Sequence, residues 1–566
     1  MLKPATHQFR TIALLGVLAV TTTGLSAAPA ANNDERARRF IAAHEEKVRP
    51  LDQAAQLAWW TANTTGKDEA FKAKEEAQNR LDLALCDKAR FAELTAIRRD
   101  KVSDPVLARQ IEILHLQYLE KQVDPALLRK MTAKANAVEK VFNTTRAKVD
   151  GKELTDSQVR SILKESKSSD ERRKVWEASK SVGALVAADL KELITLRNES
   201  ARALGFSDYH VLQLHLAEQN QADVLKLFDE LDVLTREPFA VAKAEIDSKL
   251  AQNCGVRTDQ LRPWHYHDPF FQESPAVFAA NLDRAFTGVD ILKLCREFYQ
   301  GIGLPVDAVL AASDLYEKPG KCPHAFSIDI DRQGDVRVLA NIVPNEHWMG
   351  TMLHELGHSV YSSQNIPAQM PWVLRSEAHI LCTEGMAMMM ERFSKRADWL
   401  VKMGVSLDNP DEFNRSAAKI RRNELLIFSR WCQVMLRFEK EMYAHPDQDL
   451  NKLWYDLVDR YQQVRRPEGR NAPDYAAKIH IVTAPAYYHN YVLGQMFACQ
   501  VFRTIARDVL KTDPSKALFN GNKEVGKFLK ERIFSHGRMY SWNDLVRRAT
   551  GEELKPRAFA AEFGAN

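Results

Sequence analysis

The sequence predicts a mainly α-helical fold, and three features support this prediction. Gly and Pro, which interrupt helices, number only 23 and 22 among 566 residues. Charged stretches such as 68–80 and 157–179 carry apolar residues at three- and four-residue steps, the spacing of one helix face. A convincing strand pattern occurs only around residues 325–343. Because large helical proteins often form one body, we expect residues 31–566 to fold as one domain with two lobes.

The composition excludes several classes of protein. Hydrophobic residues make up 45% of the chain and charged residues 27%, which is typical of a globular protein and not of a disordered or collagen-like one. The 79 Lys and Arg residues nearly balance the 75 Asp and Glu residues and leave a net charge of +4. This balance gives no electrostatic signature of nucleic-acid binding, so we expect no nucleic-acid partner.

The first thirty residues have the pattern of a signal peptide. Lys3 and Arg10 form a basic start, residues 11–25 are mostly apolar, and residues 28–30 (Ala-Pro-Ala) offer a small-x-small cleavage site. A membrane anchor is the less favoured alternative, because this apolar stretch is shorter than the roughly 20 residues that span a bilayer. No later segment is apolar enough to span one. We therefore expect an exported protein, periplasmic or secreted, without a stable membrane anchor after cleavage.

Residues 33–250 are expected to form a series of helices. The Asp-Pro pairs at 104–105 and 124–125 and the Asp-Gly pair at 150–151 predict short turns between them. The segment 257–274 differs, because it is dense in aromatic residues and holds two prolines. We interpret it as a loop, and such loops often line a site. Four of its residues are candidates for site or core, with neither role favoured: Trp264, His265, Tyr266 and His267.

The middle of the chain predicts a β-hairpin followed by a helix. Residues 325–331 alternate apolar and polar side chains, and residues 336–343 are rich in β-branched ones. Asn345 is a suitable N-cap for a helix that we expect to run through Gln364. From Ala378 onward the chain is expected to be helical, with breaks at three prolines: Pro446, Pro467 and Pro485.

The helix that follows the hairpin contains the sequence His354-Glu355-Leu356-Gly357-His358, an H-E-x-x-H motif. Residues four apart share one helix face, so both imidazoles can bind one metal ion. Glu355 lies beside them and can accept a proton from a metal-bound water. With 16 His among 566 residues, chance supplies roughly 0.04 such motifs. The motif predicts a catalytic centre with one Zn²⁺ per chain and Glu355 as its general base.

The third zinc ligand is expected to be an acid downstream of the motif. A catalytic zinc has three protein ligands and one open position, and the extended motif with a third His is not present, since Gln364 falls within it. Two acids compete. Glu384 begins an apolar, Met-rich run that would pack against the zinc helix, whereas Glu377 lies beside Arg375 and could be a surface residue or a partner of the metal ligands. The spacing favours Glu384 and leaves Glu377 open.

With these residues the chain resembles the angiotensin-converting-enzyme family of peptidyl-dipeptidases and, more distantly, the thimet oligopeptidases. The resemblance covers about residues 320–500 and implies a deep substrate groove between two helical lobes. It selects Glu384 as the third zinc ligand, with His354 and His358. Besides the zinc helix, three stretches carry it: His324-Ala325, thirty residues before His354; Leu374-Arg375, with Arg375 nine residues before Glu384; and Lys478-Ile479-His480, followed by Pro485 and by Tyr487, Tyr488 and Tyr491.

The resemblance implies a catalytic role for two residues beyond the zinc motif. Attack on a peptide carbonyl creates an oxyanion that needs a hydrogen-bond donor. Tyr491 is the expected donor, because a phenol with a pKa near 10 keeps its proton at neutral pH. His480 would donate to a carbonyl of the substrate.

Five further residues are implied to bind the peptide. Lys478 and Tyr488 would hold the terminal carboxylate of the substrate through charge-assisted hydrogen bonds, with Tyr487 in the same cluster. His324 and Ala325 lie on the edge strand, where the peptide backbone would pair as an additional strand. Such backbone pairing does not depend on side chains and implies broad use of oligopeptide substrates.

These roles predict an enzyme that removes dipeptides from the C-terminus of oligopeptides. Without the carboxylate contacts, the same centre would make an oligoendopeptidase of the thimet oligopeptidase type. An aminopeptidase is disfavoured, since no G-x-M-E-N-like stretch occurs. A catalytically inactive peptide-binding protein is disfavoured because Glu355 and all three ligands are present.

The sequence departs from the family pattern at several positions. Asn490 stands where the family has an Arg linked to chloride activation, which argues against chloride dependence. Met388 stands where the family has an Asp behind the zinc ligands. Cys322 has no cysteine partner near Asn341 for the family's disulfide. The loop after the zinc motif is two residues longer than the family's usual spacing.

Overall fold

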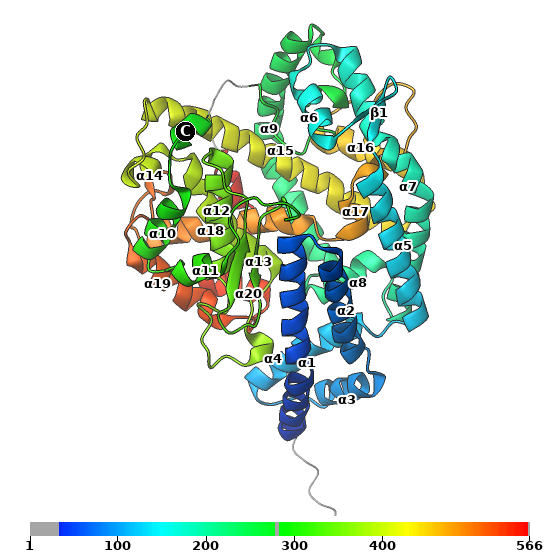
Figure 1. The fold of residues 1–566 in the computed structure, drawn as a ribbon, viewed down its shortest axis with the longest axis vertical. Helices are drawn as coiled ribbons and strands as arrows, with labels where there is room; N and C mark the ends of the chain where they lie inside the picture. Colours follow the sequence, from blue (N-terminus) through cyan, green and yellow to red (C-terminus); the bar gives the residue numbers. More distant parts are fainter. Residues whose placement is uncertain (1–32, 278–281, 564–566) are drawn as a thin grey trace, which may run out of the picture.

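The structure is a computed structural model that describes residues 33–277 and 282–563. Residues 1–30, the predicted signal peptide, lie outside these ranges. Across the described residues the fold is mainly helical with two small antiparallel sheets, which confirms the predicted fold class (Figure 1). Among the described helices, none combines the length and the apolar character that crossing a bilayer requires.

The N-terminal half of the described chain is built from long helices. Asp104 and Asp124 cap α4 and α5 through their side chains, each followed by Pro at the first helical position, which confirms the two turns predicted there. In chain order the helices are α1 (Asn33–Thr65), α2 (Asp68–Leu85), α3 (Lys88–Arg99), α4 (Pro105–Glu120), α5 (Pro125–Thr144), α6 (Asp156–Glu165), α7 (Ser169–Ala203), α8 (Tyr209–Leu216) and α9 (Gln221–Cys254).

The third predicted turn is a β-hairpin turn, so its assignment as a helix–helix connection was wrong. Asp150 and Gly151 join β1 (Ala147–Val149) to β2 (Lys152–Leu154), with φ of +49° and +81°. Two consecutive residues with positive φ form the turn whose twist matches a hairpin, and Asp-Gly is one of the dipeptides that favour it. The flanking strands are three residues long, too short to show an alternating pattern.

The C-terminal half of the described chain surrounds the predicted hairpin. Strands β3 (Phe326–Asp329) and β4 (Val336–Leu339) pair antiparallel, with Phe326 opposite Leu339. The hairpin is confirmed, and both strands are shorter than predicted. The helices are α10 (Ile291–Gly301), α11 (Asp307–Ala312), α12 (Glu346–Val360), α13 (Ile380–Glu391), α14 (Ala397–Lys402), α15 (Pro410–Ala444), α16 (Leu450–Gln462), α17 (His480–Thr483), α18 (His489–Asp508), α19 (Lys523–Arg532), α20 (Trp542–Thr550) and α21 (Arg557–Ala560).

The helix that carries the zinc motif, α12, begins as predicted and ends earlier. The side chain of Asn345 caps it by accepting from the Trp348 N–H. It stops at Val360 instead of Gln364. Beyond that point the Ser363 N–H donates to the Asp329 carboxylate of β3, at 3.0 Å, in place of a helical hydrogen bond. The serine-rich end of the helix therefore turns toward the hairpin.

Glycine allows three central helices to approach closely. A Cβ atom at Gly357 of α12 would lie 2.6 Å from the Cα of Ala387 in α13, and one at Gly385 would lie 2.6 Å from the Phe497 ring in α18. Neither contact is possible for a larger residue without displacing the helices. The close packing of α12, α13 and α18 fixes the zinc motif relative to α13.

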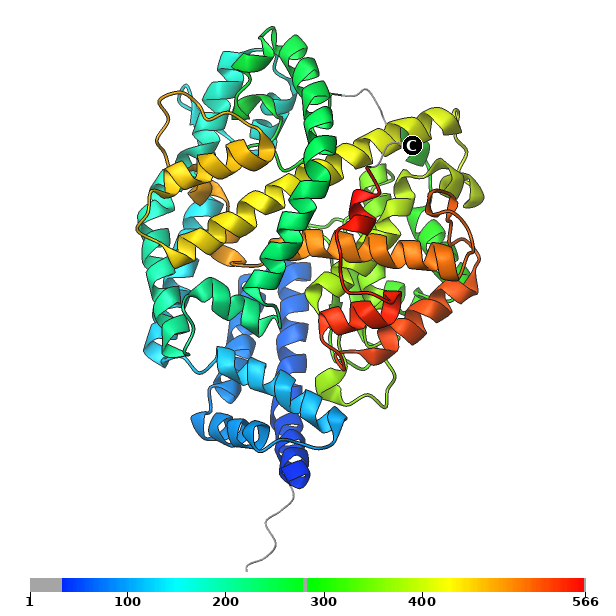
Figure 2. The ribbon, with the colours of Figure 1, turned by 180° about the vertical axis from the view of Figure 1, so that it is seen from behind.

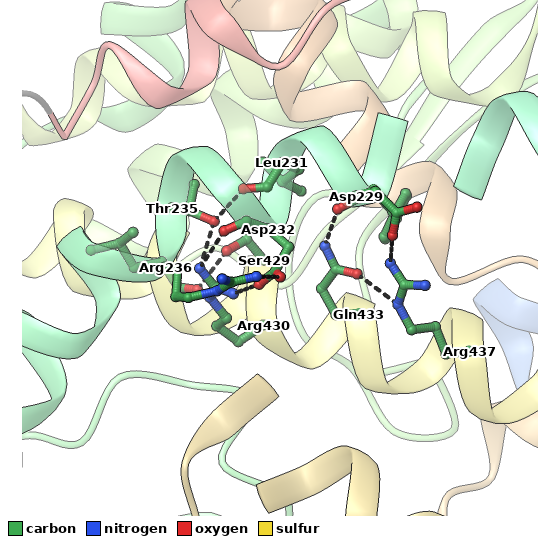
Figure 3. A network of polar contacts seen from close by, with 11 residues as sticks. Asp229, Leu231, Asp232, Thr235, Arg236, Ser429, Arg430, Gln433 and Arg437 are labelled. Atoms are coloured by element: carbon green, nitrogen blue, oxygen red, sulfur yellow. Dashed lines mark hydrogen bonds and ion pairs between the residues drawn. The ribbon is translucent and has the colours of Figure 1, made fainter. Parts of the chain in front are cut away.

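A buried polar network joins α9 to α15, which cross on the face shown in Figure 2. Arg430 of α15 forms an ion pair with Asp232 of α9 and donates to the Thr235 hydroxyl at 2.8 Å (Figure 3). Farther along the same helices, Arg437 donates to the Asp229 carboxylate at 2.6 Å. The first pair is buried, with side-chain exposures of 2% and 9%, whereas Asp229 is 68% exposed.

The two ion pairs provide a matched test of what burial contributes to stability. Asp232→Ala should lower the free energy of unfolding by about 3–5 kcal/mol, because it leaves the buried Arg430 guanidinium without its partner. Asp229→Ala should cost at most about 1 kcal/mol, as expected for an exposed pair. Urea denaturation of both variants measures the difference, and equal effects would contradict it.

Candidate metal centre and peptide site

Three side chains converge between α12 and α13. The Nε2 atoms of His354 and His358 lie 3.1 Å apart, and a Glu384 oxygen lies 3.6 Å and 3.9 Å from them. Ligands about 2.1 Å from one tetrahedral ion are about 3.4 Å apart, close to these separations. Glu384 is 9% exposed, and together the three residues could hold a metal ion.

The opposite nitrogen of each histidine ring is engaged by α13. The Nδ1 of His354 donates to the Glu391 carboxylate at 3.0 Å, and the Nδ1 of His358 lies 2.7 Å from the Thr383 hydroxyl. Burial alone would raise the pKa of Glu391, but the hydrogen bond and the charge of His354, together with the charges of Lys395 and Arg421, lower that pKa. Both rings therefore direct Nε2 toward Glu384, and such contacts orient metal ligands.

Glu391 belongs to the candidate site through its hydrogen bond with His354, and the sequence did not reveal it. The family's Asp would lie at Met388, one turn after Glu384, whereas Glu391 lies two turns after it at the end of α13. A helix repeats its face after seven residues, so Glu391 can reach the same histidine from the next turn. The i+7 spacing from Glu384 is the sequence signal that would have identified it.

Glu355 is buried beside the three residues, at 7% exposure. Burial raises its pKa to about 7, and the neighbouring His354 opposes this shift. The backbone of Ser327 in β3 also forms a hydrogen bond with the carboxyl group. A carboxyl group with a pKa near neutrality is suited to take up and return a proton.

Two tyrosines lie near the centre, Tyr487 just before α18 and Tyr491 in its first turn. The rings of Tyr487 and Tyr491 lie 5.4 Å apart, and their hydroxyls are hydrogen-bonded. Burial, with a smaller contribution from the nearby Glu384 carboxylate, raises the pKa of Tyr491 to about 12. Tyr491 therefore keeps its proton at neutral pH, as expected for a hydrogen-bond donor.

Lys478 and Tyr488 meet at a third residue, Gln272. The Gln272 side-chain oxygen accepts from the Lys478 ammonium at 2.5 Å and from the Tyr488 hydroxyl at 3.4 Å. Burial lowers the pKa of Lys478 to about 8, partly offset by the Asp268 and Glu273 carboxylates. The side chains of Lys478 and Tyr488 thus converge on the Gln272 side-chain oxygen.

Gln272 belongs to the aromatic segment 257–274, but the four candidates of that segment pack elsewhere. His265 lies 2.9 Å from the Ser169 hydroxyl, and Tyr266 donates to Asp247 at 2.9 Å. Trp264 packs on Trp176, with ring centroids 6.0 Å apart. His267 accepts from the backbone N–H of Ala276 at 3.1 Å. The loop thus contributes the Gln272 amide to the candidate site, which its aromatic composition did not predict.

The remaining predicted residues lie around this arrangement. His480 is half-buried, burial lowers its pKa to about 4, and its neutral ring lies against Tyr488 with centroids 5.1 Å apart. His324 is exposed and Ala325 half-buried, immediately before β3. Glu377, the alternative third ligand, is not among the three residues that could hold a metal ion.

The cysteines form no disulfide within the described residues. Cys322 is free, and the Asn341 amide donates to its backbone carbonyl at 3.0 Å. A hydrogen bond therefore connects the two positions where the family has a disulfide. Five cysteines are buried and pack as small apolar side chains: Cys254, Cys295, Cys382, Cys432 and Cys499.

The helical fold and the two-histidine, one-glutamate group beside an acid define the class of a helical metallopeptidase. Residues 31–563 match the model of the angiotensin-converting enzyme peptidase family. The chain belongs to this family, which makes it a peptidase that acts on peptides.

Similar proteins agree with this membership. The chain is 20% identical to an angiotensin-converting enzyme of Theromyzon tessulatum, over 94% of this chain and 91% of that protein. It is 25% identical to an angiotensin-converting enzyme-related protein of Drosophila melanogaster, over 52% of this chain and 49% of that one. It is also 25% identical to carboxypeptidase 1 of Bacillus subtilis, over 41% of this chain and 50% of that one.

The hydrogen bond from His354 to Glu391 predicts an effect on metal binding. Glu391→Ala should weaken Zn²⁺ affinity about 10- to 100-fold, the usual effect of losing a residue that orients a metal ligand. Glu377→Ala is the matched control and should leave the affinity unchanged. Competition with a chromogenic chelator measures both, and a Glu391→Ala variant with wild-type affinity would contradict the prediction.

Proposed function

We propose that this protein is an exported zinc peptidase that releases dipeptides from the C-terminus of oligopeptides. The main support for this cleavage mode is that the Lys478 ammonium and the Tyr488 hydroxyl converge on the Gln272 side-chain oxygen. Export rests on the sequence of residues 1–30, and either the periplasm or the extracellular space is consistent with it.

The chemistry of the site fits zinc. Two imidazoles and one carboxylate form a donor set typical of catalytic zinc, and both Nδ1 atoms are already engaged by Glu391 and Thr383. When bound, zinc supplies a Lewis acid that polarises the scissile carbonyl and lowers the pKa of a water molecule. One such group among the described residues corresponds to one ion per chain.

The side chains of this protein divide the remaining work. Glu355 takes the proton from the attacking water and returns it to the leaving amine, which its pKa near 7 allows. Tyr491 donates a hydrogen bond to the oxyanion as it develops. His480, neutral because of its burial, donates to a carbonyl of the substrate.

The polar groups of Lys478, Tyr488 and Gln272 are suited to bind a terminal carboxylate. The ammonium and the phenol are both donors to an anion, and the Gln272 amide can offer its N–H groups once the substrate arrives. Trp431 and Phe270 surround Lys478, each ring centroid within 5.4 Å of its nitrogen, so little water competes. Tyr487 completes the tyrosine cluster next to Tyr491.

The strand β3 is proposed to bind the rest of the peptide. It pairs with β4 on one side, and the backbone from His324 and Ala325 to Ser327 leads to the general base Glu355. A peptide added along this edge would be held by its backbone, independently of its side chains.

Chloride is not part of the proposal. Asn490 replaces the family's Arg, is 3% exposed, and accepts from the Gln219 amide at 2.7 Å. Gln219 also lies 2.7 Å from His489. These neutral groups satisfy one another and offer no cation for an anion at that position.

Loss of the general base should be separable from loss of the metal. Glu355→Gln preserves size and hydrogen bonding but cannot accept a proton, so kcat should fall at least about 100-fold. The variant should retain wild-type zinc content, as measured by elemental analysis. Near-normal turnover would show that Glu355 is structural.

The cleavage mode is tested by mass spectrometry of peptide digests. Free-acid peptides should shorten two residues at a time from the C-terminus, and amidation should lower kcat/KM about 10- to 150-fold, since it removes a charge-assisted contact. Lys478→Ala should cause a similar loss on free acids and little further loss on amides. Cuts scattered through the peptide and indifferent to amidation would instead identify an oligoendopeptidase.

The preference for free carboxylates should depend on pH. The free enzyme holds Lys478 as a cation below a pKa of about 8, and the charge is lost as the pH rises through that value. Above pH 8 the kcat/KM ratio of free-acid to amidated peptide should therefore decline toward one. A ratio that stays constant from pH 7 to 10 would exclude Lys478 as the carboxylate partner.

A further inference from the structure

The segment that carries the proposed substrate contacts contains a strained turn. Between the end of α17 and the start of α18, Ala486 has φ of +54°. This left-handed conformation is disfavoured for residues other than glycine because the Cβ atom approaches the backbone. Tyr487 and Tyr488 follow directly, so the direction of both side chains depends on this residue.

A buried acid holds the turn. Glu439 of α15 is 1% exposed, and its side-chain oxygen accepts a hydrogen bond from the Ala486 N–H at 3.0 Å. Burial raises the pKa of Glu439 to about 8, and the hydrogen bond from Ala486 and the charge of Arg197 oppose this shift. An acid in such a position is costly unless its contacts compensate.

The stretch before the turn is held by Arg197 of α7. Its guanidinium donates to the backbone carbonyls of Ile481 and Val482 and to the Tyr443 hydroxyl, the last at 3.0 Å. The segment is therefore fixed from two long helices, by a cation before Pro485 and by an acid after it. Arg197 and Glu439 both bind the backbone of this segment. They therefore fix the path of the chain through its backbone and not through the side chains proposed to bind substrate.

We propose that Glu439 is a positioning residue of the peptidase site: by accepting the Ala486 N–H it stabilises the left-handed turn that directs Tyr487, Tyr488 and Tyr491. This inference rests on the proposed function, because the tyrosines are the groups through which it acts. Two side-chain contacts depend on the turn. Tyr488 reaches Gln272 at 3.4 Å, and its ring lies 5.4 Å from that of Tyr491.

The test compares variants at both ends of the hydrogen bond. Glu439→Ala should speed amide hydrogen exchange in residues 484–491 and lower kcat/KM roughly 10-fold or more. Glu439→Gln retains an oxygen acceptor and should behave as the wild type. Glu441→Ala, on the same helix, is the matched control and should change neither readout. Ala486→Pro removes the N–H and excludes positive φ while Glu439 stays in place, so it should reproduce both losses.

A double variant separates positioning from general stability. Glycine adopts positive φ readily, so Ala486→Gly combined with Glu439→Ala should lose less activity than Glu439→Ala alone. The proposal is overturned if Glu439→Ala leaves exchange in 484–491 unchanged, if Glu439→Gln is as impaired as Glu439→Ala, or if glycine gives no rescue. If Glu439→Ala does not fold, Ala486→Pro takes its place as the test, and wild-type hydrogen exchange and activity in that variant would overturn the proposal.

Failure of the Glu439 proposal can be distinguished from failure of the proposed cleavage mode. Hydrogen exchange reports the turn without any substrate. If the wild type showed no preference for free-acid over amidated peptides, the carboxylate site would be refuted while the exchange comparison still tested Glu439. If the preference exists, Glu439→Ala should reduce it, because Tyr488 loses its fixed position.

Discussion

The close approach of α12 to α13 at Gly357 is the constraint on which the site depends. A side chain at this position would collide with the Ala387 backbone, so only glycine allows the observed packing. His354 lies one helical turn before Gly357 and His358 directly after it, while Glu384 lies one turn before Ala387. The candidate ligands on both helices therefore flank the point of closest contact, and their separation follows from the packing.

The residues around this contact orient the candidate site residues through hydrogen bonds. Glu391 and Thr383 of α13 engage the Nδ1 atoms of both histidines, and the backbone of Ser327 in β3 forms a hydrogen bond with Glu355, the proposed general base. The proposed substrate contacts come from other parts of the chain, since Lys478 and Gln272 are separated by 206 residues in the sequence. Elsewhere in the fold, a buried ion pair joins the long helices α9 and α15.

Local periodicity explains which parts of the site could be predicted. His354, Glu355 and His358 were evident because residues four apart share a helix face. Glu384 needed the family resemblance to separate it from Glu377, since spacing alone does not give the crossing of two helices. Glu391 and Gln272 were missed because their roles depend on tertiary packing. The β1–β2 hairpin was missed because its strands have only three residues.

The most direct test of this account is the zinc content of purified Glu384→Ala beside the wild type and Glu377→Ala. Elemental analysis should find about one zinc per chain in the wild type and in Glu377→Ala, and a large loss in Glu384→Ala. Chelation should abolish the peptidase activity of the wild type, and added zinc should restore it. Full zinc content in Glu384→Ala, or activity that survives complete removal of the metal, would contradict the centre described between α12 and α13.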